Sequence, residues 1–142
     1  MYVWKDNLTM SEKLLELIKT NTQNYPLSSI EAISRVIISK SYYACYNKIV
    51  ELNDLYGLGK SNPGEGSHIN TIDRVQLYDS EKGFSPNVRT EITRNMRYLK
   101  ENRTKADYEL GSSYLYNIKS VEKHLAKAKD IFELLEHPKN TN

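Results

Sequence analysis

One segment limits the fold of this chain more than any other. Residues 29–56 form a long helical pattern with apolar side chains on nearly every side. Ser28 and Glu31 match the capping box that opens helices, and Gly57 is the residue type that tolerates a left-handed C-terminal cap. At 1.5 Å per residue this helix is roughly 40 Å long. Because a helix that is apolar all round needs partners on every side, we expect it at the centre of a bundle and regard it as a candidate oligomer interface.

The other helical segments are shorter, and turn residues separate them. The capping-box pair Thr9 and Glu12 predicts the start of the first helix, and Pro26 separates it from the second. Further helices are expected over residues 67–77, from about 86 to 106, and over 114–137. We therefore predict an all-α fold, a four- to five-helix up-and-down bundle with a long central second helix. It forms one domain over residues 1–142, with about 1–8 and 137–142 frayed.

Composition sets the broad class of the protein. The chain has 142 residues, 39% apolar and 27% charged, with a net charge of +2; this suffices for one core and excludes disorder except at the ends. Apolar runs such as residues 36–38 are far short of the ~20 residues that cross a bilayer, and the N-terminus lacks a signal-peptide pattern. We therefore expect a cytoplasmic protein with no membrane partner. The single cysteine, Cys45, is expected to be a buried structural thiol.

The small net charge conceals an uneven distribution. Between Arg89 and Lys105 the chain carries six basic and two acidic residues, so this window has a charge of +4 and the rest of the chain sums to −2. Four of the six arginines fall in the window. The planar guanidinium is the side chain that matches phosphate best, so this segment is the most informative one for function.

One arginine of this basic helix is predicted to point inward. With Val88 at zero and about 100° per residue, the apolar residues occupy an arc of roughly 80°, and Arg103 falls inside it at about 60°. Two interpretations stay open: an internal salt bridge between Arg103 and Asp107 that fixes the helix end, or an arginine at the rim of a cleft that receives a phosphate. The basic residues on the opposite side, where solvation explains them, are Arg94, Arg97 and Lys105.

The histidines supply one further candidate. His68 titrates in the range that proton transfer needs, although capping or bridging the glycine-rich loop before it is the simpler role. His124, beside Lys123, and His137 are expected at the surface. No set of His, Cys, Asp and Glu has metal-ligand spacing, so we expect no metal and no cofactor.

The eleven tyrosines are numerous for a chain of this length. Bases stack on tyrosine, and tyrosines interleaved with basic residues mark platforms for single-stranded nucleic acid. Most tyrosines here fall at core-like helical positions, where they fill a core or an interface. Tyr98 and Tyr108, near the arginines, are the two that we regard as exceptions.

Three segments, in this order, resemble a known family. Residues 39–46 (SKSYYACY) are similar to its Tyr-Tyr-Ala block on a long helix, residues 66–70 (GSHIN) to its Gly/Ser–His helix start, and residues 103–108 (RTKADY) to its Arg-x-x-Ala-Asp-Tyr block. The family is the HEPN superfamily (higher eukaryotes and prokaryotes nucleotide-binding). The resemblance covers about residues 28 to 136 and is to small stand-alone members, in the branch similar to the helical C-terminal domain of kanamycin nucleotidyltransferase.

The resemblance implies a HEPN-like helical domain that dimerises, with a cleft between protomers lined by the ends of the fourth helices. Active members are metal-independent ribonucleases whose signature is an arginine followed by four to six residues and a histidine. Arg103 would stabilise the scissile phosphate, but the pair Asp107 and Tyr108 occupies the histidine position, and the next histidine is His124. Tyr108 and His68 are the candidate replacements for proton transfer.

Two hypotheses of different classes follow. The first is a HEPN-type protein of a bacterial toxin–antitoxin or antiviral defence system that engages RNA or a nucleotide as a homodimer, with endoribonuclease activity as its enzymatic form. The second is a catalytically silent interaction module that partners a nucleotidyltransferase. A plain structural dimer, with Arg103 buried and paired and no cleft beside it, is a third. For the first, the candidate catalytic residues are Arg103, Asp107, Tyr108 and His68, and the candidate RNA- or phosphate-binding residues are Arg97, Arg94, Lys100 and Lys105.

Overall fold

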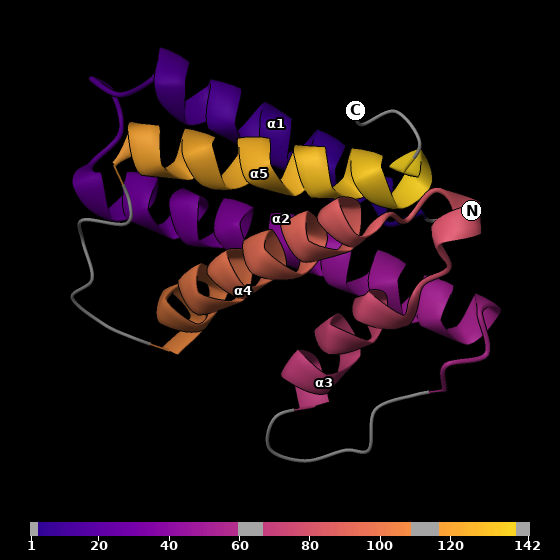
Figure 1. Cartoon of the computed structure of the whole chain (residues 1–142). Coiled ribbons are helices and arrows are strands. Elements are labelled where there is room, and N and C mark those ends of the chain that lie inside the picture. Colours follow the sequence, from indigo (N-terminus) through magenta and orange to yellow (C-terminus); the bar gives the residue numbers. More distant parts are fainter. Residues whose placement is uncertain (1–2, 60–66, 109–116, 139–142) are drawn as a thin grey trace.

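The structure, a computed structural model, describes residues 3–59, 67–108 and 117–138. Within these ranges the regular elements are all helical and contain no strand, which confirms the predicted all-α class (Figure 1). Two short 3₁₀ turns, Arg74–Leu77 and Ser80–Lys82, follow the third helix. The helices are α1 (Lys5–Thr20), α2 (Leu27–Leu55), α3 (Ser67–Asp73), α4 (Pro86–Tyr108) and α5 (Ile118–Glu136).

The long second helix is the centre of the bundle, as the sequence predicts. Helix α2 packs against α1, α3, α4 and α5, so every other helix contacts it (Figure 1). Its side chains are buried on several sides, including Ile37, Tyr42 and Ile49. Because α3 and α4 both pack on α2, residues about thirty positions apart in the chain meet beside it.

Helix α2 ends in the left-handed cap expected at Gly57. Gly57 has φ +71°, and its N–H donates to the Asp54 carbonyl at 3.1 Å. The N–H of Leu58 donates to the Asn53 carbonyl at 2.8 Å. This pair of hydrogen bonds is the Schellman pattern, which satisfies carbonyls that the helix end leaves free.

The first two helices begin earlier than the capping boxes predict. Helix α1 begins at Lys5, so the predicted start at Thr9 and the predicted fraying of residues 5–8 are wrong. Two features carry the helix back toward the N-terminus: Leu8 is buried, and the Asp6 carboxylate lies in the first turn, where the helix dipole favours negative charge. Helix α2 begins at Leu27, directly after Pro26, and shows no side-chain cap.

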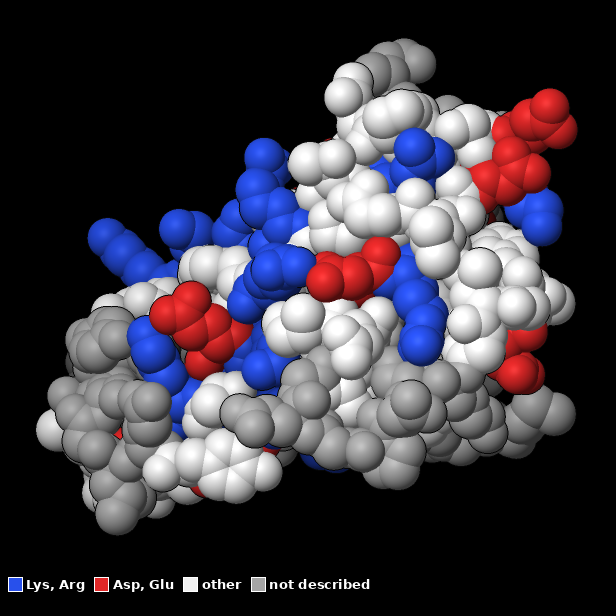
Figure 2. Space-filling view, turned by 60° about the horizontal axis from the view of Figure 1, so that its bottom comes forward, with Lys and Arg blue, Asp and Glu red and all other residues white. Residues whose placement is uncertain are grey.

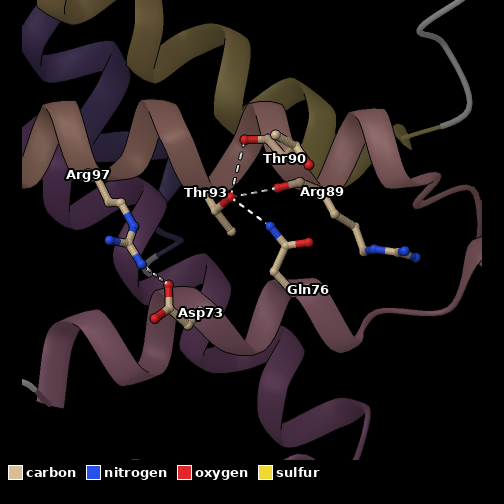
Figure 3. A network of polar contacts seen from close by, with 6 residues as sticks. All are labelled: Asp73, Gln76, Arg89, Thr90, Thr93 and Arg97. Carbon is tan, nitrogen blue, oxygen red and sulfur yellow. Dashed lines mark hydrogen bonds and ion pairs between the residues drawn. The ribbon is translucent and has the colours of Figure 1, made fainter.

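Polar contacts hold α4 to the segment that contains α3 (Figure 3). The Nη1 atom of Arg89 lies 3.0 Å from the Tyr78 carbonyl and 2.8 Å from the Phe84 carbonyl, so it ties the connection between the two helices to the start of α4. Further along α4, the Gln76 amide donates to the Thr93 hydroxyl at 2.9 Å, and Arg97 forms an ion pair with Asp73. These contacts set the distance between α3 and the basic helix.

A helix that crosses a bilayer needs about 20 mostly apolar residues. In the described part of the chain, no helix is both long and apolar enough to cross a membrane.

Candidate functional site

Arg103 points into the bundle, as its position on the basic helix predicts. The residue is only 7% exposed. Its guanidinium carbon lies 5.2 Å from the ring centre of Tyr42 and 5.4 Å from that of Tyr43, both on α2. A guanidinium over the face of an aromatic ring is attracted by the ring's negative face, so these tyrosines offset part of the cost of burying the charge.

The ion pair between Arg103 and Asp107 is present but incomplete. Nη1 of Arg103 donates to Oδ2 of Asp107 at 3.4 Å, which is long for a charged hydrogen bond. The Nε atom of Arg103 is buried and has no hydrogen-bond partner among the described residues. Burial disfavours the charged form of Arg103, but Tyr43, Tyr42 and Asp107 outweigh it and raise the pKa of this guanidinium. The arginine is therefore charged and keeps unused hydrogen-bonding capacity.

His68 joins the same group of side chains through Tyr42. The Tyr42 hydroxyl lies 2.7 Å from Nδ1 of His68, and the imidazole stacks on the Tyr46 ring with centres 4.2 Å apart. Burial, with the positive charges of Arg103 and Lys100, lowers the pKa of His68 below its usual value. His68 is therefore neutral at pH 7.

Tyr108 completes the group at the exposed end of α4. It is 75% exposed, and its ring centre lies 6.0 Å from the guanidinium carbon of Arg103. The structure thus brings together all four candidate catalytic residues from the sequence and adds two tyrosines that the sequence analysis assigned to the core. We call this set the arginine–tyrosine cluster; its members are Arg103, Asp107, Tyr108, His68, Tyr42 and Tyr43.

A groove between α3 and α4 adjoins the cluster. Its volume is about 430 Å³. Its lining comes from one residue of α3 and five of α4: Ile69, Arg97, Lys100, Glu101, Thr104 and Lys105. Figure 2 shows lysine and arginine side chains gathered on one side of this part of the molecule, with acidic side chains among them.

The four predicted phosphate-binding residues differ in their surroundings. Arg97 is ion-paired with Asp73, and Nζ of Lys105 lies 3.3 Å from Oε1 of Glu101. The positive charges of Arg97 and Lys105 are therefore partly neutralised. Arg94 is exposed and does not line the groove. Lys100 lines the groove and is close enough to His68 to lower its pKa. Of the four, Lys100 is the cation that connects the groove to the arginine–tyrosine cluster.

The expectation of a surface position for His124 is wrong. His124 is fully buried, with Nε2 3.0 Å from the Ile38 carbonyl and Nδ1 3.2 Å from the Asn102 amide nitrogen. Burial lowers its pKa to about 4. It lies three residues after the buried Val121 and four before Ala128, so the helical period already placed it on the apolar face of α5. A neighbouring lysine is a weaker signal than this period.

Cys45 and most of the tyrosines that the structure describes behave as the sequence predicts; Tyr2, Tyr114 and Tyr116 lie outside the described residues. Cys45 is fully buried and its thiol donates to the Ala128 carbonyl, and burial raises the pKa of that thiol. Tyr42 and Tyr78 are buried in the core. Of the two proposed exceptions, Tyr108 is exposed, whereas Tyr98 lies beneath the ammonium groups of Lys123 and Lys127 on α5.

One group of potential metal ligands was not apparent from the sequence spacing. Glu133, Glu136 and His137 place their ligand atoms within 4.8 Å of one another at the end of α5. All three are exposed, and Glu136 forms an ion pair with Lys5 at 3.8 Å. Exposed carboxylates gather in this way without a metal, so we assign none to them.

Fold and site define a small helical bundle with a buried, tyrosine-packed arginine beside a basic groove. Comparison with protein-family models, with curated proteins and with solved structures gives no match.

Proposed function

We propose that this protein binds the phosphate groups of single-stranded RNA or of a nucleotide in the groove between α3 and α4. The observation that carries the proposal is the basic groove: Arg97, Lys100 and Lys105 line it, and the positive charges of Lys100 and Arg103 are both near enough to His68 to lower its pKa. In the setting that the HEPN resemblance suggests, the protein is a homodimer in the cytoplasm of a bacterium and acts in a toxin–antitoxin or antiviral defence system.

Size and charge both support a nucleotide-sized anion. Ligand pockets commonly measure about 300–1,000 Å³, and this groove has about 430 Å³. Lys100 supplies a cation at the wall of the groove. The positive charge of Arg103 lies close enough to affect the neighbouring His68 as well. Because Arg103 itself is only 7% exposed, its main contribution is electrostatic. In this proposal the direct contacts come from Lys100, which lines the groove, and from His68, the chain neighbour of the lining residue Ile69.

The enzymatic form of the proposal is a metal-independent endoribonuclease. It needs a group that takes the proton of the ribose 2′-hydroxyl and a cation that stabilises the phosphate. The candidates for moving this proton are Asp107, Tyr108 and His68, which lie near Arg103 and carry groups able to accept or donate a proton. Incubation of RNA with the protein in the presence of a metal chelator, followed by gel analysis, tests this form directly.

Binding is tested by fluorescence anisotropy with a labelled single-stranded RNA of about ten nucleotides. We expect Lys100→Ala to weaken binding about three- to tenfold through the loss of one hydrogen bond. Arg103→Gln should weaken it about two- to fivefold through the loss of a screened charge. The matched control is Lys13→Ala, which removes an exposed lysine from α1, and circular dichroism verifies that each variant is folded. If the wild type binds no better than the Lys100 and Arg103 variants, the proposal is wrong.

A second candidate is a catalytically silent module that partners a nucleotidyltransferase. The observation that favours it is the burial of Arg103 together with the aspartate that stands where the resembled signature has histidine. Co-expression with a minimal nucleotidyltransferase from a neighbouring gene, followed by co-purification, tests this candidate. Light scattering of the protein alone tests the proposed homodimer. A plain structural role for Arg103 is disfavoured by its unpaired Nε and the adjacent groove.

A further inference from the structure

We infer that Tyr42 is a positioning residue that holds His68 with its proton on Nε2, so that His68 offers an N–H donor to a phosphate. The role in phosphate binding rests on the proposed function, whereas the position of the proton does not. The inference comes from the contact of 2.7 Å between the Tyr42 hydroxyl and Nδ1 of His68.

The length of this contact and the chemistry of the two groups indicate which one donates. At 2.7 Å it is shorter than the usual N–H donor distance of about 2.9–3.0 Å and typical of an O–H donor. A phenol is also a stronger hydrogen-bond donor than an imidazole N–H, so the Tyr42 hydroxyl donates its proton and Nδ1 of His68 accepts it. Nδ1 of the neutral imidazole then carries no proton, and Nε2 carries it.

The surroundings of Tyr42 keep the phenol protonated and in place. Tyr42 is fully buried, and burial raises the pKa of its hydroxyl far above the usual range, although Arg103 opposes the rise. The His68 ring lies nearly parallel to both tyrosine rings, at 8° to Tyr42 and 11° to Tyr46. The imidazole is therefore fixed in orientation by stacking and in tautomer by the hydroxyl.

This arrangement assigns His68 to binding and not to proton abstraction. A neutral histidine acts as a base through an unprotonated nitrogen, and here that nitrogen is Nδ1, which Tyr42 occupies. The nitrogen left for a ligand carries a proton and donates it in a hydrogen bond. Together with Lys100 at the wall of the groove, it forms a pair of donors suited to phosphate oxygens.

The tautomer is measured on the free wild-type protein by long-range ¹H–¹⁵N correlation NMR of the histidine rings at pH 7.5. We expect His68 to show a protonated Nε2 and an unprotonated Nδ1. Tyr42→Phe, which removes one oxygen, shifts His68 toward a mixture of tautomers. Tyr46→Phe is the control, because it keeps the stacked ring and leaves the Tyr42 hydroxyl in place; its His68 signals keep the wild-type pattern. A proton on Nδ1 in the wild type overturns the inference without recourse to any variant.

Affinity for the same labelled RNA gives the second readout. Tyr42→Phe and His68→Ala weaken binding about three- to tenfold, in line with the loss of one hydrogen bond, whereas Tyr46→Phe stays within about twofold. Failure of the wild type to bind RNA contradicts the proposed function and leaves the tautomer result standing. Normal binding by His68→Ala shows instead that RNA is bound without His68 and overturns its role as a donor.

Discussion

At the scale of single residues, Asp107 places a negative charge beside Arg103. Its carboxylate is 28% exposed and lies 3.4 Å from Nη1. A partly exposed pair of this length contributes little to stability, because solvent screens it. The carboxylate therefore acts mainly as a competitor that a ligand phosphate has to overcome electrostatically.

The substitution Asp107→Asn tests this competition. Asparagine keeps an acceptor for Arg103 but removes the negative charge, so we expect RNA affinity to rise about two- to fivefold, as expected for removal of one screened charge. The free energy of unfolding, measured with urea, should fall by less than about 1 kcal/mol. Weaker binding by this variant would show that Asp107 takes part in holding the ligand.

His124 makes the stability of the protein depend on pH. Burial lowers its pKa from 6.5 to about 4 in the folded state, so the unfolded chain binds more protons than the folded one between these pH values. The stability that the neutral His124 contributes to the folded protein is fully present above pH 6.5 and is lost as the pH falls toward 4. The loss is on the order of 3 kcal/mol.

The measurement is urea unfolding of the wild type and of His124→Gln from pH 7.5 to pH 4.5. Glutamine can donate and accept hydrogen bonds but does not titrate, so the variant should be less stable at pH 7.5 and show a shallower pH dependence. Parallel curves for the two proteins would mean that His124 does not cause the decline.

Single-residue predictions from sequence succeed where helical geometry alone decides. The inward direction of Arg103 follows from its angle on the wheel, and Asp107 follows one turn later. The contact between His68 and Tyr42 joins residues 26 positions apart, and no local pattern encodes it. Tyr42 and Tyr43 were recognisable as part of a block but not as partners of the arginine.

At the scale of elements, α4 is attached to the α3 segment at several points along its length. Arg89, Thr93 and Arg97 lie four residues apart, so they share one face of α4 (Figure 3). Each of them contacts the preceding segment. Two of the arginines that raise the local charge, Arg89 and Arg97, thus bind α4 to the segment before it.

Arg89→Ala should therefore act on stability. Its Nη1 lies within hydrogen-bonding distance of two carbonyls and the Ser80 hydroxyl, and bonds to charged groups are worth about 1.5–3 kcal/mol. We expect a loss of that order in urea unfolding, with faster hydrogen exchange over residues 78–84. Arg94→Ala, on the exposed side of α4, is the control and should change stability by less than about 0.5 kcal/mol. Equal effects of both variants would contradict this role of Arg89.

The helices themselves were largely predictable, but their first residues were not. The end of α2 was predicted correctly because glycine, which stands at position 57, adopts a positive φ without strain. The start of α1 was missed because a capping box is a short pattern that also occurs inside helices. The packing of the buried Leu8 extends the helix back before this pattern.

At the scale of the whole molecule, the net charge is only +2, and the positive charge is concentrated on α4, which packs against α3. The window from Arg89 to Lys105 carries +4 against −2 elsewhere, and much of it faces the groove. A polyanion is therefore attracted to one region of an otherwise balanced surface. The sequence located this charge; the groove itself depends on the approach of two separate helices and was not predictable.

RNA binding should accordingly weaken with salt in a limited way. If two or three phosphates are neutralised, the logarithm of the association constant falls against the logarithm of salt concentration with a slope of about −1.4 to −2. Lys100→Ala should reduce the slope by about 0.7, whereas Lys13→Ala should leave it unchanged. A slope near zero would show that the RNA is bound without phosphate contacts.

The buried cysteine provides a way to measure how often the bundle opens. Cys45 on α2 faces the Ala128 carbonyl on α5, and both residues are fully buried. A thiol reagent reaches this sulfur only when the two helices separate, so the rate of its modification reports how often the bundle opens. Since the chain has a single cysteine, the modification rate reports on Cys45 alone. A slower rate after addition of RNA would show how much a ligand in the groove reduces the opening of the bundle.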